Sequence, residues 1–356
     1  MSIRDRVHRV TARGLDCRAL RALVLDEIRK EAPFDWYVWL LTDPETGVGS
    51  APLADVPSLG DLPTLIRLKY LTPVNRWSEL PSNSATTLQH ATKGDRSTSL
   101  IWRQLLAGYG VDDVLSIVFR DQYGCWGFLD LWRLHGSFST DECAVVDQVA
   151  MALNPSLRTC LAPAFANGAG MLVCCDGPAV LLLSGQLRLL TQTPQTEAFL
   201  RALLPTPADR SPVPAAAYNV AAQLLARESG VDAHQPSARV HLRDGIWVTL
   251  RAARIDETSS NAGASIAVSI ELTAPSHRTA LYSRVLGFSE RESELLQHLV
   301  GGCDTRELAD RLFVSQHTVQ DHLKSIFDKA GVNSRRLLIA RATGSASDTS
   351  RGNTVA

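Results

Sequence analysis

The spacing of apolar residues changes along the chain and divides it into three regions. In the first region, apolar residues recur at helical spacing over residues 17–31, and apolar runs at residues 36–41, 114–120 and 126–133 predict strands. A short turn containing glycine separates the last two runs, which is typical of an antiparallel hairpin. The first region is therefore expected to combine helices with an antiparallel sheet.

Two more helices are predicted in the first region. One covers residues 59–71. The other begins at Ser139, because Ser139 and Glu142 have the spacing of a capping box, and Pro155 is expected to end it. The irregular polar segment at residues 77–99 predicts a loop or a partly ordered stretch.

The second region follows a stretch rich in small residues at 162–170 and ends near Pro275. Its apolar pattern predicts two helices, at residues 197–203 and 218–226. It also predicts five strands, at residues 179–183, 187–190, 238–242, 247–254 and 265–272. This order of elements indicates an α+β domain built on one five-stranded sheet.

The third region, residues 284–341, carries only helix signals. Ser289 and Asp304 each precede a glutamate by three residues, as in a capping box, and Ser315 has the position of a third N-cap. After Ser315, one apolar stripe is formed by Val319, Leu323, Ile326 and Ala330. Short helices, a tight turn and a longer amphipathic helix are typical of a helix-turn-helix.

The polar face opposite that stripe carries His317, Gln320, Asp321 and Lys324. These side chains suit the base edges of the DNA major groove, where glutamine pairs with adenine, aspartate accepts from cytosine and lysine donates to guanine or phosphate. The alternative to DNA binding is that these four residues form an ordinary solvated helix face. A zinc site at His317 and His322 is excluded, because five residues of helix point the two rings in different directions.

The third region resembles the LuxR/GerE-type DNA-binding domain. The matching motifs are FSERE at 288–292, TRELADRLFVS at 305–315, HTVQDH at 317–322 and KAGVNSR at 329–335. This resemblance implies DNA contacts from Ser315, Gln316, His317, Thr318, Gln320, Asp321 and Lys324. It also implies a dimer contact through the last helix, at Arg335, Leu338 and Arg341. His317 stands where the family usually has a phosphate-binding lysine, so that contact is expected to be weaker or pH-dependent.

The upstream regions resemble sensor domains in the order of their elements, a GAF domain at residues 17–160 and a PAS-like domain at residues 165–275. Such folds commonly hold a small ligand or a partner surface. We expect Trp36, Trp39 and Trp126 to line a ligand pocket, with ordinary core packing as the alternative. The chain is thus predicted to be multidomain, with two α+β sensor domains, a four-helix DNA-binding domain at 284–342 and a disordered tail at 343–356.

Composition narrows the class of protein. Lys and Arg number 36 and Asp and Glu 37, so the net charge is −1 and any contact with DNA must come from one local face. Seven cysteines without a CxxC pair argue against a disulfide scaffold and for a reducing compartment, and the vicinal Cys174 and Cys175 are expected in a core strand. The N-terminus lacks a signal-peptide pattern and no apolar stretch spans a membrane, which predicts a cytoplasmic protein.

These observations predict a transcriptional regulator that binds double-stranded DNA as a homodimer. Its signal is expected to be an unknown small ligand or protein, and RNA polymerase is kept open as a further partner. The nine histidines have no ligand spacing and no catalytic motif is present, so we expect no enzyme activity, cofactor or metal. The alternative is an interaction adaptor that uses the helix-turn-helix without reading DNA sequence.

Overall fold

The protein is described by a computed structural model that covers residues 1–166, 177–203, 212, 214–242, 245–255 and 265–345. The chain forms two compact units. The first, here called the two-sheet unit, comprises Met1–Cys160, Cys175–Val240 and Val248–Glu271. The second, the C-terminal unit, comprises Leu161–Cys174, His241–Trp247 and Leu272–Ala356. The expected tail falls largely at residues 346–356, and Cys174 and Cys175 at 167–176, both outside the described residues.

The first sheet of the two-sheet unit has the strand order β2-β1-β5-β4-β3, with antiparallel neighbours. Its strands are β1 (Trp36–Thr42), β2 (Gly49–Asp55), β3 (Thr86–Thr87), β4 (Asp113–Asp121) and β5 (Gly124–Arg133). The predicted hairpins are confirmed, because the aromatic and β-branched runs pair across their turns.

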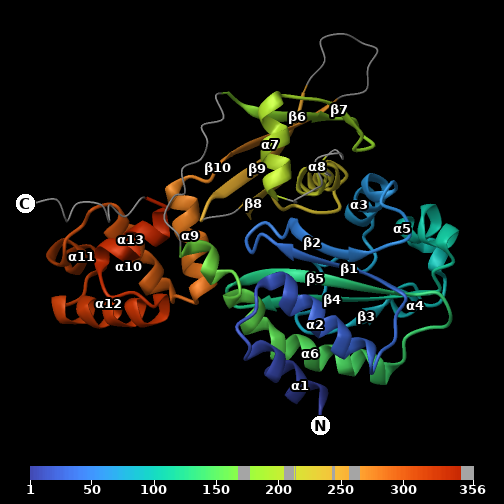
Figure 1. Cartoon of the computed structure of the whole chain (residues 1–356), viewed down its shortest axis with the longest axis horizontal. Helices are drawn as coiled ribbons and strands as arrows, with labels where there is room; N and C mark the ends of the chain where they lie inside the picture. The colour runs from blue at the N-terminus through green and yellow to red at the C-terminus, as the bar shows by residue number, and fades with distance from the viewer. Residues whose placement is uncertain (167–176, 204–211, 213, 243–244, 256–264, 346–356) are drawn as a thin grey trace, which may run out of the picture. The chain divides into compact units, whose positions relative to one another are not determined.

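Helices cover both faces of this sheet (Figure 1). Three helices pack together on one face: α1 (Ile3–Thr11), α2 (Cys17–Arg29) and α6 (Thr140–Thr159). The opposite face is covered by α3 (Leu62–Leu71), α4 (Leu88–Ala91) and α5 (Leu100–Gln104), with short 3-10 turns at Arg96–Thr98 and Leu106–Tyr109. The segment predicted as a loop therefore contains β3, α4 and a 3-10 turn.

One expectation for the first region is wrong. Helix α6 is capped by Ser139 and Glu142 as predicted, but it continues through Pro155. Its last turn is held by the fully buried Leu157 and by the Thr159 hydroxyl, which donates to the Pro155 carbonyl at 3.0 Å. One disulfide, which the cysteine pattern does not predict, joins Cys17 to Cys160.

The second sheet has the strand order β7-β6-β10-β9-β8, which confirms one antiparallel five-stranded sheet. Its elements are β6 (Ala179–Leu183), β7 (Leu189–Gln192), α7 (Pro194–Leu203), α8 (Ala215–Glu228), β8 (Ser237–His241), β9 (Trp247–Arg254) and β10 (Ile266–Leu272). Helix α8 carries many alanines, and it packs closely against α3 and β2 of the first sheet. The two sheets are thus joined through α8 into one unit.

The C-terminal unit is helical over the described part of residues 272–345, after a 3-10 turn at Ala162–Phe165. Its helices are α9 (Pro275–Leu286), α10 (Glu290–Val300), α11 (Thr305–Leu312), α12 (Gln316–Ala330) and α13 (Arg335–Thr343). Helices α10 to α13 gather into one cluster (Figure 1), with α10 in contact with α11, α12 and α13. The predicted run of helices is confirmed.

Candidate nucleic-acid interface and internal cavity

The turn between α11 and α12 is set by local hydrogen bonds. Phe313 ends α11 in the left-handed region, with a φ of 54°, and the Val314 amide donates to the Ala309 carbonyl at 3.0 Å. Ser315 then caps α12, because its hydroxyl accepts the Thr318 amide at 3.0 Å. This tight connection fixes the direction in which α12 leaves the turn.

One side of α12 is buried and the other is open. Val319, Leu323, Ile326 and Ala330 are buried, as the apolar stripe predicts. The side chains of Gln316, His317, Gln320, Asp321 and Lys324 are all exposed, while Thr318 is half-buried. The structure therefore places these exposed residues, which the sequence predicts to contact DNA, together on the N-terminal half of one helix.

The charges on this face are mixed. His317 Nε2 lies 3.7 Å from Asp321 Oδ2, one helical turn away, and both side chains are well exposed, at 88% and 68%. Lys324 is the basic residue one further turn along the same face.

The buried carboxylate of Glu292, predicted as part of a capping box, also fixes α12 on α10, a role that the capping pattern does not indicate. Glu292 accepts hydrogen bonds from the Ser289 amide at 2.7 Å, the Ser325 hydroxyl at 2.6 Å and the Lys329 ammonium at 2.6 Å. Burial alone would raise its pKa, but these donors outweigh burial and lower the pKa of Glu292 to about 2. The capping-box glutamate therefore also anchors α12 through Ser325 and Lys329.

The residues expected at a dimer contact do not share one exposed surface. Leu338 is fully buried in the core of the C-terminal unit, so it offers no side-chain surface to a second copy. Arg341 donates to the Ala330 carbonyl at 3.0 Å, and Arg335 donates to the Thr305 hydroxyl at 2.6 Å. These contacts order the domain internally, and a dimer contact through α13 stays a prediction.

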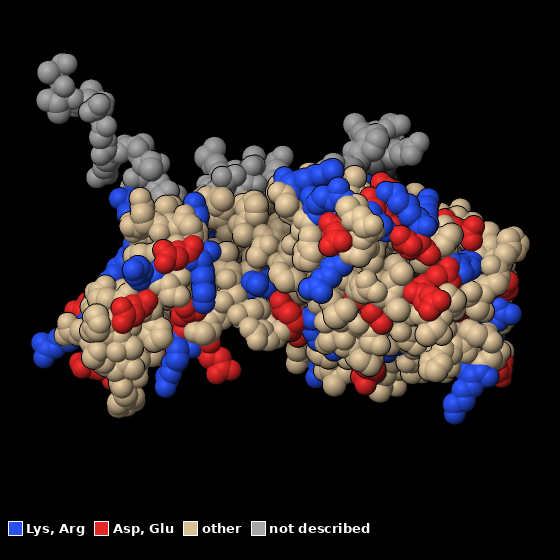
Figure 2. All heavy atoms as spheres, turned by 90° about the horizontal axis from the view of Figure 1, so that it is seen from below, with Lys and Arg blue, Asp and Glu red and all other residues tan. Residues whose placement is uncertain are grey.

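The face of the molecule drawn in Figure 2 carries Lys and Arg side chains intermingled with Asp and Glu, in keeping with the net charge of −1. Among the described residues, no group of three or more His, Cys, Asp or Glu side chains could hold a metal ion. No helix in the same part of the chain is both long and apolar enough to cross a membrane.

A family model described as bacterial regulatory proteins of the luxR family matches residues 286–342. The match covers α10 to α13, including the capped turn and the exposed face of α12. This segment is a LuxR-type helix-turn-helix domain. The family is one of bacterial regulatory proteins, and a LuxR-type helix-turn-helix implies DNA binding by this segment.

A curated relative is similar over a short stretch. The chain is 42% identical over 50 residues to the probable transcriptional regulatory protein SgaR of Hyphomicrobium methylovorum, which is 14% of this chain and 24% of the relative. The chain thus spans about a quarter of that relative, and the similarity concerns part of each protein.

Two solved structures show only distant likeness. Escherichia coli SdiA is 12% identical, with 96% of each chain covered and a TM-score of 0.31. The bacteriophytochrome RpBphP3 of R. palustris is also 12% identical, with 79% of this chain and 75% of that chain covered and a TM-score of 0.30. Likeness at this level carries no argument about the sensor regions, so their GAF-like and PAS-like character stays a proposal.

The two-sheet unit contains a partly open cavity of about 350 Å³. Its floor is the face of the first sheet formed by even-numbered residues, because alternate side chains of a strand point to the same side. These residues are Val38, Leu40, Pro52, Ala54, Val114, Ser116, Phe128, Asp130 and Trp132. Helices α3 and α8 supply further walls, including Lys69, Tyr70, Ala215 and Asn219.

The three tryptophans expected in a pocket lie outside the lining of this cavity. Trp39 stacks on Phe119 with ring centroids 5.0 Å apart, and Trp126 is fully buried, with its indole N–H donating to Asp121. Trp36 packs edge-on against Tyr109. The tryptophan in the cavity wall is Trp132, whose place follows from its register opposite Val114.

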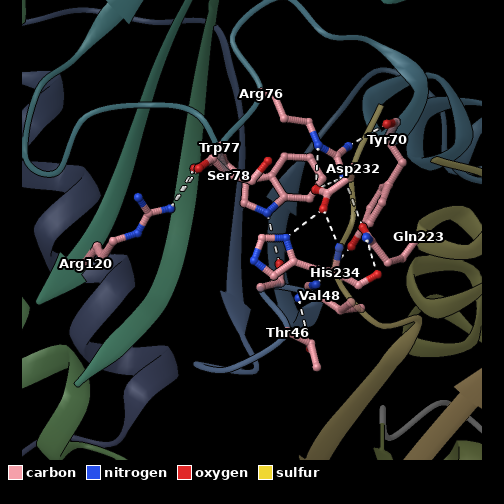
Figure 3. A network of polar contacts seen from close by, with 12 residues as sticks. Thr46, Val48, Tyr70, Arg76, Trp77, Ser78, Arg120, Gln223, Asp232 and His234 are labelled. Atoms are coloured by element: carbon pink, nitrogen blue, oxygen red, sulfur yellow. Dashed lines mark hydrogen bonds and ion pairs between the residues drawn. The ribbon is translucent and has the colours of Figure 1, made fainter. Parts of the chain in front are cut away.

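A network of buried polar groups holds α8 in place beside the cavity (Figure 3). Arg76 pairs with Asp232 at 2.7 Å and donates to the Gln223 side-chain oxygen at 3.0 Å. Burial raises the pKa of Asp232, but hydrogen bonds from His234 and Arg76 outweigh burial and lower it overall. The hydrogen bond to Asp232 raises the pKa of His234. No spacing in the sequence signals this network, since its partners lie about 150 residues apart.

Proposed function

We propose that this chain is a sequence-specific transcriptional regulator that binds DNA as a dimer and reads the major groove with α12. The observation that carries the proposal is the exposed hydrogen-bonding face of α12, presented by a capped turn and a buried stripe. Gln320, Asp321 and Lys324 are assigned to base edges, and Ser315, Gln316, His317 and Thr318 to the backbone and flanking contacts.

Control is assigned to the two-sheet unit, which is joined to the LuxR-type domain in one chain. GAF-like and PAS-like folds in this unit would receive a small ligand or a protein signal. In this proposal the chain is a regulator and not an enzyme, and RNA polymerase is a candidate partner at promoters. The support comes from the cavity and from the α+β architecture of the unit.

The test is selection of bound sequences from a random pool of duplex DNA by the full-length protein. We expect an enriched palindromic site, because a dimer with two-fold symmetry contacts two half-sites. The double variant Gln320→Ala/Lys324→Ala is expected to lose the enrichment. The matched control is Arg291→Ala/Glu294→Ala, an exposed pair on α10, which should keep it.

Retained enrichment in the Gln320→Ala/Lys324→Ala variant would contradict the assignment of α12 to base reading. Absence of any enriched site would favour the adaptor alternative. The dependence of affinity on salt gives a second readout. With a net charge of −1 and a contact limited to one face, we expect a shallow slope of log affinity against log salt, because few phosphates are neutralised.

A further inference from the structure

The cavity of the two-sheet unit has the size and lining of a small-molecule site. Its volume of about 350 Å³ lies within the range usual for ligand pockets. Most of its lining side chains are apolar, from Val38 and Leu40 on β1 to Leu65 and Ile66 on α3. The body of a fitting ligand is therefore apolar, since an apolar lining disfavours a strongly hydrated molecule.

The buried charges in the wall compensate each other. Lys69 donates to Asp130 at 2.6 Å, with side chains 15% and 7% exposed, and Asp130 also accepts from the Ser116 hydroxyl at 2.7 Å. A ligand carboxylate beside this pair would be repelled by Asp130, and a ligand ammonium would be repelled by Lys69. Arg18, the other charged residue of the lining, is exposed to solvent. The wall therefore favours an uncharged ligand over an ion.

Helix α8 contributes an unsatisfied acceptor. Asn219 is 1% exposed, its side-chain N–H donates to the Ala215 carbonyl at 2.8 Å, and its Oδ1 has no donor among the described residues. Buried polar atoms normally have a partner. Asn75, which also lines the cavity, has a buried Nδ2 without an acceptor in the same part of the chain. A ligand with a donor and an acceptor would supply both.

The position of Asn219 is set by the packing of α8, the helix on which it lies. Gln223, one turn further along α8, receives the Arg76 hydrogen bond, and α8 packs on α3 and β2. A molecule in the cavity would therefore touch the first sheet and α8 together.

We propose that this cavity binds an uncharged, mainly apolar small molecule whose polar group carries an N–H or O–H donor for Asn219, so that α8 forms part of the site. The proposal builds on the control by a signal proposed above. Binding is measured here without DNA, so its failure would leave the DNA-binding proposal standing, and a failure of DNA selection would leave this one standing.

The first experiment titrates the full-length protein with N-phenyl-1-naphthylamine, an uncharged apolar dye that fluoresces in apolar surroundings. We expect saturable binding of one dye per chain. Ala54→Trp, an exposed change in the cavity lining on β2, should weaken binding at least tenfold. Ala12→Trp, an exposed change at the end of α1, should leave it unchanged. Equal binding by the Ala54→Trp variant would place the dye elsewhere and overturn the proposal.

The second experiment displaces the dye with molecules of one chain length. Octanamide is expected to act at least tenfold below the concentrations needed for octanoate or octylammonium, and several-fold below N,N-dimethyloctanamide, which lacks the N–H. In Asn219→Leu the advantage of octanamide over its dimethyl analogue should vanish, a change that loss of structure alone would not produce. Equal potency of charged and uncharged ligands, or no saturable binding of either the dye or octanamide, overturns the proposal.

Discussion

The LuxR-type domain and the two-sheet unit place their charged groups differently. In the LuxR-type domain, the polar residues assigned to DNA stand exposed on α12, and the buried Glu292 ties that helix to α10. In the two-sheet unit, ion pairs between distant parts of the chain are buried, among them Asp43 with Arg239. The LuxR-type domain thus combines short-range capping and periodicity with one buried carboxylate, whereas the two-sheet unit depends on buried ion pairs between residues 156 and 196 positions apart.

The largest expected effect comes from breaking the Asp43–Arg239 pair. Arg239 donates to Asp43 from its backbone amide at 2.9 Å and from its guanidinium at 2.7 Å, and both residues are buried. Asp43→Asn removes the buried counter-charge of the guanidinium and leaves Glu45, whose carboxylate lies 3.0 Å away but is 56% exposed, so we expect a loss of roughly 3–5 kcal/mol in the free energy of unfolding. Urea unfolding followed by tryptophan fluorescence measures this, since six of the seven tryptophans lie in the two-sheet unit.

The matched control is Glu228→Gln. Glu228 pairs with Arg254 at 2.7 Å, but these side chains are 36% and 29% exposed. Solvent screens such a pair, and the expected loss is below about 1 kcal/mol. Equal losses in the two variants would contradict the view that burial makes the Asp43 pair decisive.

The next effect concerns the LuxR-type domain. Glu292→Gln keeps the shape of the side chain but removes its charge from Ser325, Lys329 and the Ser289 amide. We expect a loss of roughly 2–4 kcal/mol, seen as faster amide hydrogen exchange in α10 and α12 of the full-length protein. Glu294→Gln, at an exposed pair on the same helix, should change exchange little.

Acid should abolish the difference between wild type and Glu292→Gln. The pKa of Glu292 is lowered from 4.5 to about 2 in the folded protein. Its charge therefore stabilises the fold fully above the unfolded value, and that stabilisation is lost as pH falls from about 4.5 toward 2. Measured at pH 6 and at steps down to pH 2, the stability gap between the two proteins should shrink. A gap that stays constant would sink this account.

The smallest expected effect is at the turn before α12. Phe313 has a φ of 54° and is 94% exposed, so it has backbone strain without the reward of burial. Phe313→Gly should stabilise the LuxR-type domain by about 0.5–1 kcal/mol, read as slower hydrogen exchange in α11. Phe313→Ala keeps the Cβ atom and should bring no such gain, and a gain of equal size would assign the effect to the lost ring.

Elements whose determining contacts are local could be predicted from the sequence. Ser289, Asp304 and Ser315 cap their helices through residues three positions away, and the stripe from Val319 to Ala330 follows helical periodicity. Strand pairs across short turns were predicted for the same reason.

Contacts between residues far apart in the sequence could not be predicted from it. The disulfide links residues 143 positions apart, and Asn219 reaches the cavity only because α8 packs on the first sheet. Pro155 suggested a helix end, but tertiary packing at Leu157 decides the outcome. Trp36 and Trp126 are candidates for a pocket because strand alternation gives each an inward face. Trp36 does pair with Trp132 on the same face of the sheet, but it packs against Tyr109, and it is Trp132 that lines the cavity.

The Asp43–Arg239 pair also bears on whether the two sheets could be exchanged separately between proteins. An exchange of the second sheet alone would remove Arg239 from Asp43 and Asp232 from Arg76. It would also remove α8 from the surface of α3 and β2 on which it packs. The two sheets are therefore expected to be inherited together, as one exchangeable part.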